Sequence, residues 1–161
     1  MEIRRAAAPD IPKINDLLSQ VLELHAALRP DIFVPGTAKY TTEELLQILT
    51  DDERPVFVAV DGADQVLGYA FCVVQHRPVS NYMIPGDTLY LDDLCVDAAG
   101  RGQGVGRRLF RFVQEEARRR GCGAVTLNVW EGNDRARAFY DSLGMKVRET
   151  QLEYILTPEE G

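Results

Sequence analysis

Apolar residues recur every three or four positions in four stretches of the chain, which is the spacing of one buried helix face. Asp10 and Pro12 are typical of a helix start, and Thr41 with Glu44 forms a capping box. Gly121 is typical of a helix end. The pattern therefore predicts helices over residues 10–28, 41–49, 105–120 and 133–143.

Six other stretches have the alternating or continuous apolar character of β-strands. In chain order they are Ile3–Ala6, Val56–Val60, Val66–Val74, Thr88–Val96, Val125–Val129 and Lys146–Leu156. A short turn over residues 61–64 predicts a hairpin, and the prolines of residues 76–87 predict a loop. The resulting order, β-α-α-β-β-β-α-β-α-β, indicates an α/β (α+β) fold.

The composition narrows the possible functions. Because the chain has 161 residues, we expect one domain, 1–161, whose core is large enough to be stable without disulfide bonds or metal ions. The net charge of -7 argues against a nucleic-acid partner, because phosphate backbones bind basic surfaces. No apolar run approaches the roughly 18 residues of a membrane span, so we expect no membrane partner. Three cysteines without metal-ligand spacing indicate packed thiols, no metal site and a cytoplasmic location.

A glycine-rich turn carries the clearest functional signal. The strand ending at Val96 is followed by Arg101-Gly102-Gln103-Gly104-Val105-Gly106 and then directly by a helix. Glycines allow positive φ and close approach of a ligand, while the first amides of a helix and its dipole favour negative charge. The turn therefore predicts a site for a phosphate-bearing ligand.

Spacing separates the known kinds of phosphate loop. A dinucleotide fingerprint counted from Gly102 would need glycine where Arg107 stands, and no acidic residue ends a strand about 20 residues later. A nucleoside-triphosphate loop would need Lys-Ser/Thr after Gly106. Neither of these two phosphate loops fits the sequence. The turn instead fits the pattern Arg/Gln-x-x-Gly-x-Gly/Ala, and the alternative is a glycine-rich loop without function.

Two motifs together resemble the GNAT acyl-CoA N-acyltransferase superfamily. The first is the glycine turn, and the second is Asn133-Asp134-Arg135-Ala136-Arg137-Ala138-Phe139-Tyr140 followed by Ser142-Leu143-Gly144-Met145, with methionine in place of the family's last aromatic residue. The resemblance covers nearly the whole chain. It implies a mixed, mostly antiparallel sheet of six to seven strands flanked by about four helices, with a splayed parallel pair that forms the CoA cleft.

The resemblance also implies a cosubstrate, acetyl-CoA, and the residues that hold it. Backbone groups of the strand before the turn would bind the pantetheine arm, and the N–H near Leu94 would hold the thioester carbonyl. The turn would bind the pyrophosphate. The implied contacts are Leu94, Cys95, Val96, Arg101, Gly102, Gln103, Gly104, Val105, Gly106, Arg107 and Asn133, the last as a contact or a helix cap.

Tyr140 matches the tyrosine that protonates the leaving thiolate in the family; the alternative is a packed core aromatic. For the base, Leu89-Tyr90-Leu91-Asp92-Asp93 resembles a strand of the polyamine acetyltransferases, in which the acid at the position of Asp92 faces the acceptor. Strand alternation puts Asp92 on the face of Leu94 and Asp93 on the opposite face. Alternatively, both carboxylates cap loop donors at a bulge.

The acceptor side is less specific. Ribosomal-protein N-terminal acetyltransferases have a catalytic glutamate on the strand after the turn, and this chain has Asn128 at that position. Because asparagine cannot act as a base, a peptide N-terminus is less favoured as the acceptor. Glu131 could replace the glutamate only if its loop turned inward. The resemblance places the acceptor near the first two helices, with His25, Arg29 and Asp93 as candidate substrate contacts. His25 could instead interact with the helix dipole.

We therefore expect an acetyl-CoA-dependent N-acetyltransferase that acts on a small-molecule primary amine by direct attack in a ternary complex. A protein lysine or N-terminus as acceptor is the alternative, followed by a non-enzymatic CoA-binding regulatory module. Similar proteins often dimerise through their C-terminal strands, so a homodimer is a further expectation.

Overall fold

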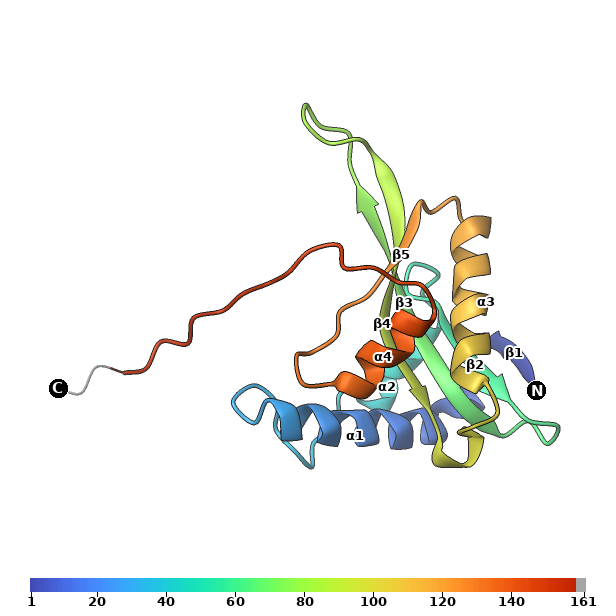
Figure 1. Cartoon of the computed structure of the whole chain (residues 1–161). Helices are drawn as coiled ribbons and strands as arrows, with labels where there is room; N and C mark the ends of the chain where they lie inside the picture. Colours follow the sequence, from blue (N-terminus) through green and yellow to red (C-terminus); the bar gives the residue numbers. More distant parts are fainter. Residues whose placement is uncertain (159–161) are drawn as a thin grey trace.

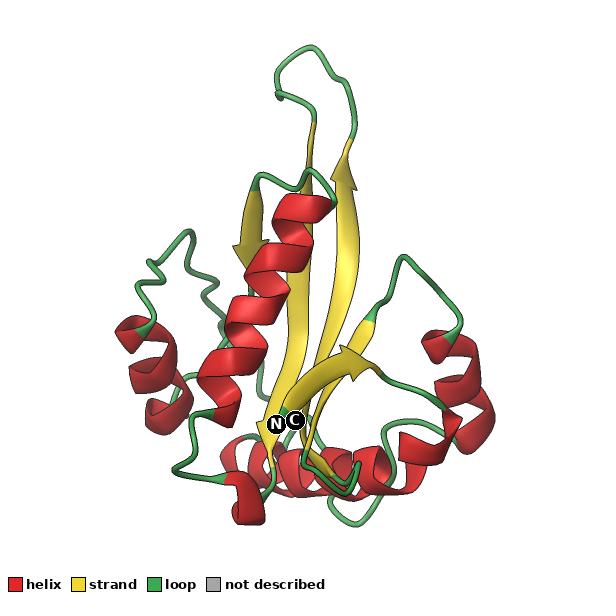
Figure 2. Cartoon of the chain, turned by 90° about the vertical axis from the view of Figure 1, so that its right-hand side faces the viewer, coloured by secondary structure: helices red, strands yellow, loops and turns green. Residues whose placement is uncertain are grey.

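The structure is a computed structural model that describes residues 1–158, and its centre is a five-stranded β-sheet. The strands are β1 (Glu2–Arg5), β2 (Val56–Val60), β3 (Val66–Arg77), β4 (Gly86–Val96) and β5 (Ala124–Thr126). They follow one another across the sheet in chain order. β1 to β4 pair antiparallel and β5 runs parallel to β4, which confirms the expected mixed, mostly antiparallel sheet (Figure 2).

Helices cover both faces of this sheet (Figure 1). They are α1 (Ile11–Leu28), α2 (Thr42–Leu49), α3 (Val105–Arg119) and α4 (Asp134–Ser142). α1 and α2 pack on one face, while α3 packs on the other with α4 beside it. Among residues 1–158, no helix is both long and apolar enough to cross a membrane.

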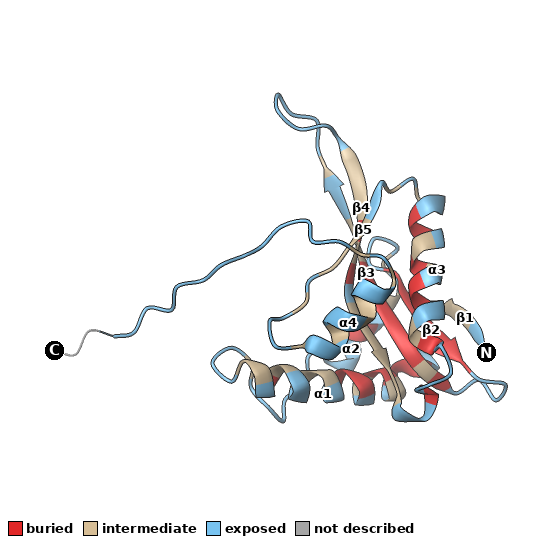
Figure 3. Ribbon diagram, viewed as in Figure 1, coloured by how far each residue is buried: buried red, intermediate tan, exposed pale blue. Residues whose placement is uncertain are grey.

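Two clusters of buried side chains, one on each face of the sheet, form the core. In Figure 3 the buried residues, drawn in red, gather on β2, β3, α1 and α3. β2 is buried along its whole length because its side chains alternate between them. Val56, Val58 and Val60 point toward α1 and α2, and Phe57 and Ala59 point toward α3. This double burial is why β2 has a continuous apolar sequence instead of an alternating one.

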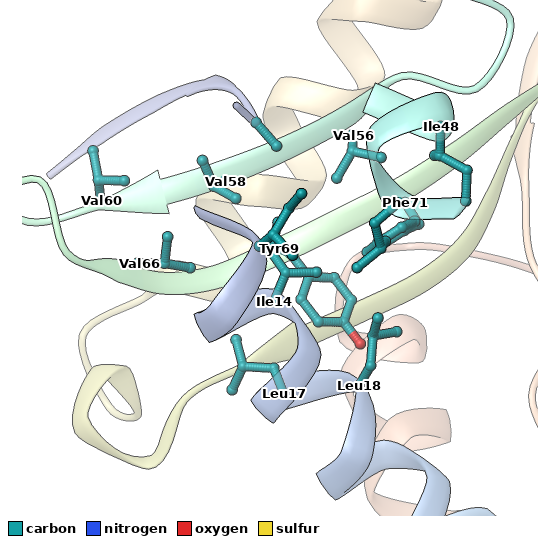
Figure 4. Close-up of a cluster of buried hydrophobic side chains, with 13 residues drawn as sticks. Ile14, Leu17, Leu18, Ile48, Val56, Val58, Val60, Val66, Tyr69 and Phe71 are labelled. Atoms are coloured by element: carbon teal, nitrogen blue, oxygen red, sulfur yellow. The ribbon is translucent and has the colours of Figure 1, made fainter. Parts of the chain in front are cut away.

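Figure 4 shows the cluster under α1 and α2. Tyr69 and Phe71 of β3 pack edge to face, with ring centroids 5.0 Å apart, against Ile14 and Leu17 of α1. Tyr69 is fully buried, so its hydroxyl group lies inside an otherwise apolar layer. Such a group needs a hydrogen-bond partner, and the partner lies in the candidate site described below.

The predicted helix starts are present, with one difference. In the capping box, Thr41 Oγ1 accepts a hydrogen bond from the Glu44 amide and Glu44 Oε1 accepts one from the Thr41 amide, both at 3.1 Å. Asp10 stands at the N-cap of α1, but its side chain does not cap that helix. Its carboxylate instead binds Arg4 and the Ala7 amide, which joins β1 to the start of α1.

The strand expected over Lys146–Leu156 is absent, and the sheet therefore has five strands instead of six or seven. After α4 the chain runs away from the sheet in an extended conformation (Figure 1). A strand needs a neighbour for its backbone groups, and β5 is itself paired over only three residues. Leu152, Tyr154 and Leu156 are consequently at least 84% exposed.

Two other boundaries differ from the prediction. β5 was expected over Val125–Val129 but spans Ala124–Thr126, because β4 remains beside it only that far. β3 and β4 instead extend past their expected limits to Arg77 and Gly86 and form a long antiparallel ribbon. The loop between them is therefore residues 78–85, shorter than the expected 76–87.

Candidate functional site

The turn between β4 and α3 has the geometry of an anion-binding site. Gly102 and Gly104 have φ values of +77° and +76°, and a Cβ at either position would point into open space. α3 begins at Val105, and the amide of Arg108 donates to the Gly104 carbonyl. The amides just before Arg108 have no helical carbonyl one turn earlier, so they are oriented to bind an anion.

Other residues of the turn have separate roles. A Cβ on Gly106 would lie 3.2 Å from the Phe139 ring, so this glycine allows α3 and α4 to approach each other. The Gln103 side-chain amide donates to a backbone carbonyl earlier in the turn, at 3.0 Å. Arg101 and Arg107 are exposed beside the turn and add positive charge there.

β4 separates from β5 soon after the two strands meet. Their ladder joins Thr88–Tyr90 to Ala124–Thr126, whereas β4 continues beside β3 as far as Val96. In the described chain, β5 therefore does not pair with the stretch of β4 that contains Leu94, Cys95 and Val96. This separation is the splayed parallel pair that the resemblance implies; backbone binding of a pantetheine arm there stays a prediction.

A β-bulge in β4 changes which way its carboxylates face. Phe71 pairs with Asp93, but the next residue of β3 pairs with Leu91, so Asp92 is the extra residue. Asp92 and Asp93 both lie opposite Phe71, on the face covered by α1 and α2. The prediction that Asp92 shares the face of Leu94 is therefore wrong, because alternation holds only in a strand without a bulge. The opposite placement of Asp93 is confirmed.

Asp93 is the hydrogen-bond partner of the buried phenol of Tyr69, with 2.8 Å between Asp93 Oδ2 and the phenol oxygen. Burial raises the pKa of Asp93 to about 6, although the Tyr69 hydrogen bond and the nearby Lys39 ammonium lower it. Burial and the Asp93 charge raise the pKa of Tyr69 well above its usual value, so Tyr69 remains a donor. A carboxyl group with a pKa near 6 can accept a proton near neutral pH.

Asp92 faces a lysine from the loop before α2. Lys39 Nζ lies 3.4 Å from Asp92 Oδ2 and 5.3 Å from the centroid of the Tyr40 ring. Burial alone would lower the pKa of Lys39, but Asp92, Tyr40 and Asp93 raise it above its usual value, so the group is an ammonium. A cavity of about 30 Å³, lined in part by Tyr40, Phe71 and Asp92, lies beside it and has room for a water molecule.

Tyr140 lies on α4, on the other side of β4. Its ring packs between Phe110 and Phe139, at centroid distances of 6.2 and 5.1 Å. Burial, and to a smaller extent the charge of Asp93, raises the pKa of Tyr140 above its usual value. The phenol therefore keeps its proton at neutral pH and can act as a donor. The fold thus brings Tyr140 and Asp93 within electrostatic reach of each other.

The asparagines that follow β5 have structural partners. Asn133 Oδ1 accepts a hydrogen bond from the Ala136 amide at 3.2 Å, which confirms the predicted helix cap; a contact with the cosubstrate stays a prediction. Asn128 lies close enough to Tyr90 to lower the pKa of its hydroxyl group, which burial raises overall. Glu131 is exposed. Within residues 127–158, no carboxylate is buried in the way that Asp93 is.

His25 lies in the last turn of α1, where it packs on Phe33 with ring centroids 5.2 Å apart. Burial, together with the charge of Lys39, lowers the pKa of His25, so its ring is neutral at neutral pH. Because a neutral ring gains little from a helix dipole, the alternative that His25 interacts with the dipole of α1 is not supported. The Lys39 ammonium is therefore close enough to His25 to influence the pKa of its ring.

Arg29 is already bound by acidic side chains. Its guanidinium group makes two hydrogen bonds to Asp31, at 2.8 and 2.7 Å, and an ion pair with Glu153 at 2.7 Å. It also lies 5.6 Å from the centroid of the Trp130 ring. A substrate contact of Arg29 stays a prediction, and it would require displacement of these partners.

Three residues of this region were missed at the level of sequence: Lys39, Tyr69 and Trp130. Trp130 packs edge to face on Phe33 at 5.6 Å, which joins the loop after β5 to the loop after α1. A tyrosine in a buried strand is a usable signal, because its hydroxyl group requires a partner. The partner could be identified only once the register between β3 and β4 was known. The sequence pattern of a single strand does not contain that register.

With the geometry described, comparisons with known proteins add an independent finding. The profile of the Acetyltransferase (GNAT) family matches residues 19–145. A mutant of the BH1408 protein from Bacillus halodurans has a similar structure, with a TM-score of 0.92 and 32% identity, over 98% of this chain and 100% of that chain.

Two curated proteins are similar in sequence. Glucosamine 6-phosphate N-acetyltransferase 1 from rice (Oryza sativa subsp. japonica) is 34% identical over 68% of this chain and 62% of its own length. Peptidyl-lysine N-acetyltransferase YjaB from Escherichia coli is 33% identical over 69% of this chain and 63% of its own length. The chain thus spans slightly less than two thirds of each of these relatives.

The pKa of Asp93 predicts an unusual pH dependence of stability. Because the folded-state pKa of about 6 lies above the usual 3.8, the native state binds this proton more tightly than the unfolded chain does. The contribution of Asp93 to the free energy of unfolding should therefore fall as pH rises from about 4 to 6. Asp93→Asn should be more stable than wild type at pH 7.5, with a smaller difference at pH 4.5, in urea denaturation.

The control is Asp16→Asn, which removes an exposed carboxylate from α1. It should change stability little and equally at both pH values. If Asp93→Asn instead loses stability relative to wild type as pH rises, the inferred pKa shift is wrong.

Proposed function

The chain belongs to the Acetyltransferase (GNAT) family, and on this premise we propose that it transfers an acetyl group from acetyl-CoA to the primary amine of a small molecule. The acceptor attacks directly in a ternary complex. The observation that carries the proposal is the placement of a carboxyl group of pKa about 6 and a protonated phenol on opposite faces of β4. They stand where this strand separates from β5.

Asp93 acts as the base on the acceptor side. An alkyl ammonium has a pKa near 10 and must lose a proton before its nitrogen can attack. Asp93 is ionised above pH 6, and its hydrogen bond from Tyr69 holds the carboxylate in place. Asp92, next to it on the same face, holds the ammonium by charge. This division of roles places the proton acceptor at Asp93, one residue beyond the position implied by the polyamine acetyltransferases.

The glycine turn and the free stretch of β4 hold the donor. Bound acetyl-CoA would supply the acetyl group as a thioester. The helix start at Val105 fits a pyrophosphate, because Gly102 and Gly104 leave open space where a Cβ would stand. The amide near Leu94 polarises the carbonyl of the bound thioester, a contribution of about 2.7–4 kcal/mol for one such donor in comparable enzymes.

Tyr140 protonates the leaving group. A thiol with a pKa of about 8.5 is a good leaving group, and a positioned phenol beside it can serve as the proton source. The raised pKa of Tyr140 ensures that the proton is present at neutral pH. Of the two protons that the acceptor nitrogen loses, one ends on the thiol sulfur and the other leaves through Asp93.

The acceptor is a small molecule in this proposal. The rice relative is named for an amino sugar phosphate, whereas the E. coli relative is named for lysine in a peptide, so the relatives support both classes. A regulatory CoA-binding module would not need Asp93 or Tyr140. The cytoplasmic location expected from the sequence stays a prediction.

The functional unit in this proposal is a homodimer. The extended tail after Met145 exposes Leu152, Tyr154 and Leu156 on alternating positions, as in a strand with one apolar face. The β5 edge, which this tail leaves open, offers the backbone groups that such a strand needs. A second copy would provide both halves at once, each tail joining the partner's sheet.

The proposed activity is tested with purified protein, acetyl-CoA, a panel of primary amines and peptides, and measurement of thiol release. Wild type should release thiol in an amine-dependent manner. Tyr140→Phe should lower kcat by about 100-fold or more, because it removes the proton donor and leaves the ring packing intact. Its Kd for acetyl-CoA, measured by calorimetry, should not change.

The matched control is Tyr82→Phe, which removes a hydroxyl group from an exposed tyrosine at the tip of the β3–β4 ribbon. It should have wild-type kcat. Tight acetyl-CoA binding without amine-dependent release would refute the enzymatic function, and an unchanged kcat in Tyr140→Phe would remove Tyr140 from its role.

The anion site predicts that Gly104→Val weakens cosubstrate binding. Valine would place methyl groups in the open space of the turn and is strained at φ +76°. The Kd for acetyl-CoA should rise by at least about tenfold, or about 1.4 kcal/mol. Gly121→Val controls for the strain, because Gly121 has φ +75° and no atom near its absent Cβ but follows α3 at its far end. Normal affinity in Gly104→Val would overturn the assignment of the turn.

The homodimer predicts a solution mass of twice 18.0 kDa by light scattering at micromolar concentration. Leu152→Glu together with Tyr154→Glu should produce monomers, since a charged strand face cannot be buried in the partner. Gln151→Glu, on the opposite face of the same tail, should leave the dimer intact. A monomeric wild-type chain would contradict this part of the proposal.

A further inference from the structure

One corner of the acceptor side already holds an ammonium group. Lys39 Nζ lies 3.4 Å from Asp92 Oδ2 and 5.3 Å from the centroid of the Tyr40 ring. A carboxylate and the face of an aromatic ring are the two partners that a protein offers to an organic cation. The contacts of Lys39 therefore indicate that this corner can bind an organic ammonium group.

The corner is built from rigid parts. The Tyr40 ring stacks on Phe71 of β3, with centroids 6.1 Å apart, and Asp92 is held opposite Phe71 by the bulge. The cavity of about 30 Å³ lies between these residues. Because a ring, a strand and a bulge define it, the corner keeps its shape whether or not an ammonium is present.

The present occupant, in contrast, is easily displaced. The Lys39 side chain is 40% exposed and reaches the corner on a flexible stem from the loop between α1 and α2. A single ion pair with this exposure contributes little stability. Its ammonium can therefore exchange with another one at small cost.

We propose that the corner formed by Tyr40 and Asp92, with Asp93 beside it, is the subsite for the ammonium of the acceptor, and that Lys39 is a stand-in that the acceptor displaces. The acceptor is accordingly an alkylammonium: a primary amine, charged in solution, on a flexible aliphatic stem like that of lysine. This inference rests on the proposed function, because it assigns the same carboxylates to the acceptor. It adds the aromatic partner, the competing lysine and the class of amine.

The subsite also explains the arrangement of the two carboxylates. Asp92 is half-exposed and faces the ammonium, whereas Asp93 is bound to Tyr69 inside the core layer. An ammonium held by Asp92 therefore lies next to the carboxylate that accepts its proton. The bulge makes this possible, because an unbulged strand would send the two side chains to opposite faces.

The test measures direct binding of butylammonium at pH 7.5 by NMR titration, in the absence of acetyl-CoA. A competitor held by a weak, partly exposed ion pair weakens apparent affinity only a few-fold, so Lys39→Met should bind butylammonium about three- to fivefold more tightly than wild type. Lys39→Arg, which keeps the cation, should resemble wild type. Lys146→Met, which removes a lysine far along the chain, should also resemble wild type.

Two further variants test the recognising groups in the Lys39→Met background. Asp92→Asn should lose most of the gained affinity, and Tyr40→Leu should lose part of it, whereas Tyr40→Phe should retain it because the ring face remains. In kinetics, Lys39→Met should lower KM for alkylamines and leave KM for acetyl-CoA unchanged. Circular dichroism melting checks that each variant folds.

The outcomes separate this inference from the proposed function. Equal or weaker butylammonium binding by Lys39→Met, or no effect of Asp92→Asn, would overturn the subsite even if acetyl transfer occurs. Tighter binding by Lys39→Met without acetyl transfer to any amine would support the subsite and refute the enzymatic function. Tetramethylammonium, which has no N–H to lose, should compete with butylammonium at the same site.

Discussion

The bulge at Asp92 is the constraint on which the rest of the site depends. One extra residue in β4 shifts the register against β3 between Phe71 and Cys72. Asp92 and Asp93 thereby face the same side of the sheet, and the ladder between β4 and β5 ends just before the bulge, at Tyr90. A single local irregularity thus accompanies both the paired carboxylates and the free backbone of β4.

The sheet separates the two groups of candidate site residues. On one face, α1, α2 and the loop between them surround the carboxylates with Tyr69, Lys39 and Tyr40. On the other face, α3 and α4 place the glycine turn and Tyr140. Gly106 lets these two helices approach each other. In the proposed reaction, the donor and the acceptor approach β4 from different sides, which suits a direct transfer between them.

Burial tunes the two ionisable groups in complementary ways. It disfavours the charged form of each, so the pKa of Asp93 rises to about 6 and the pKa of Tyr140 rises further above neutrality. The first effect yields a carboxylate that is still ionised at neutral pH but accepts protons readily. The second keeps a phenol protonated. The same physical cause thus produces a base and an acid, because the two groups start from different ordinary values.

The sequence by itself determined the helices, most of the strands and the glycine turn, because helix caps, apolar periodicity and glycines at positive φ are local properties of the chain. It also pointed to Tyr140 and to the adjacent carboxylates, with Asp92 as the base and Asp93 as a substrate contact. Only the tertiary structure decided that Asp92 turns toward Lys39, that Tyr69 is the partner of Asp93, and that Lys146–Leu156 forms no strand within its own chain. These features depend on the register between strands and on which neighbours are available, and such relations between distant segments leave no periodic trace in any one of them.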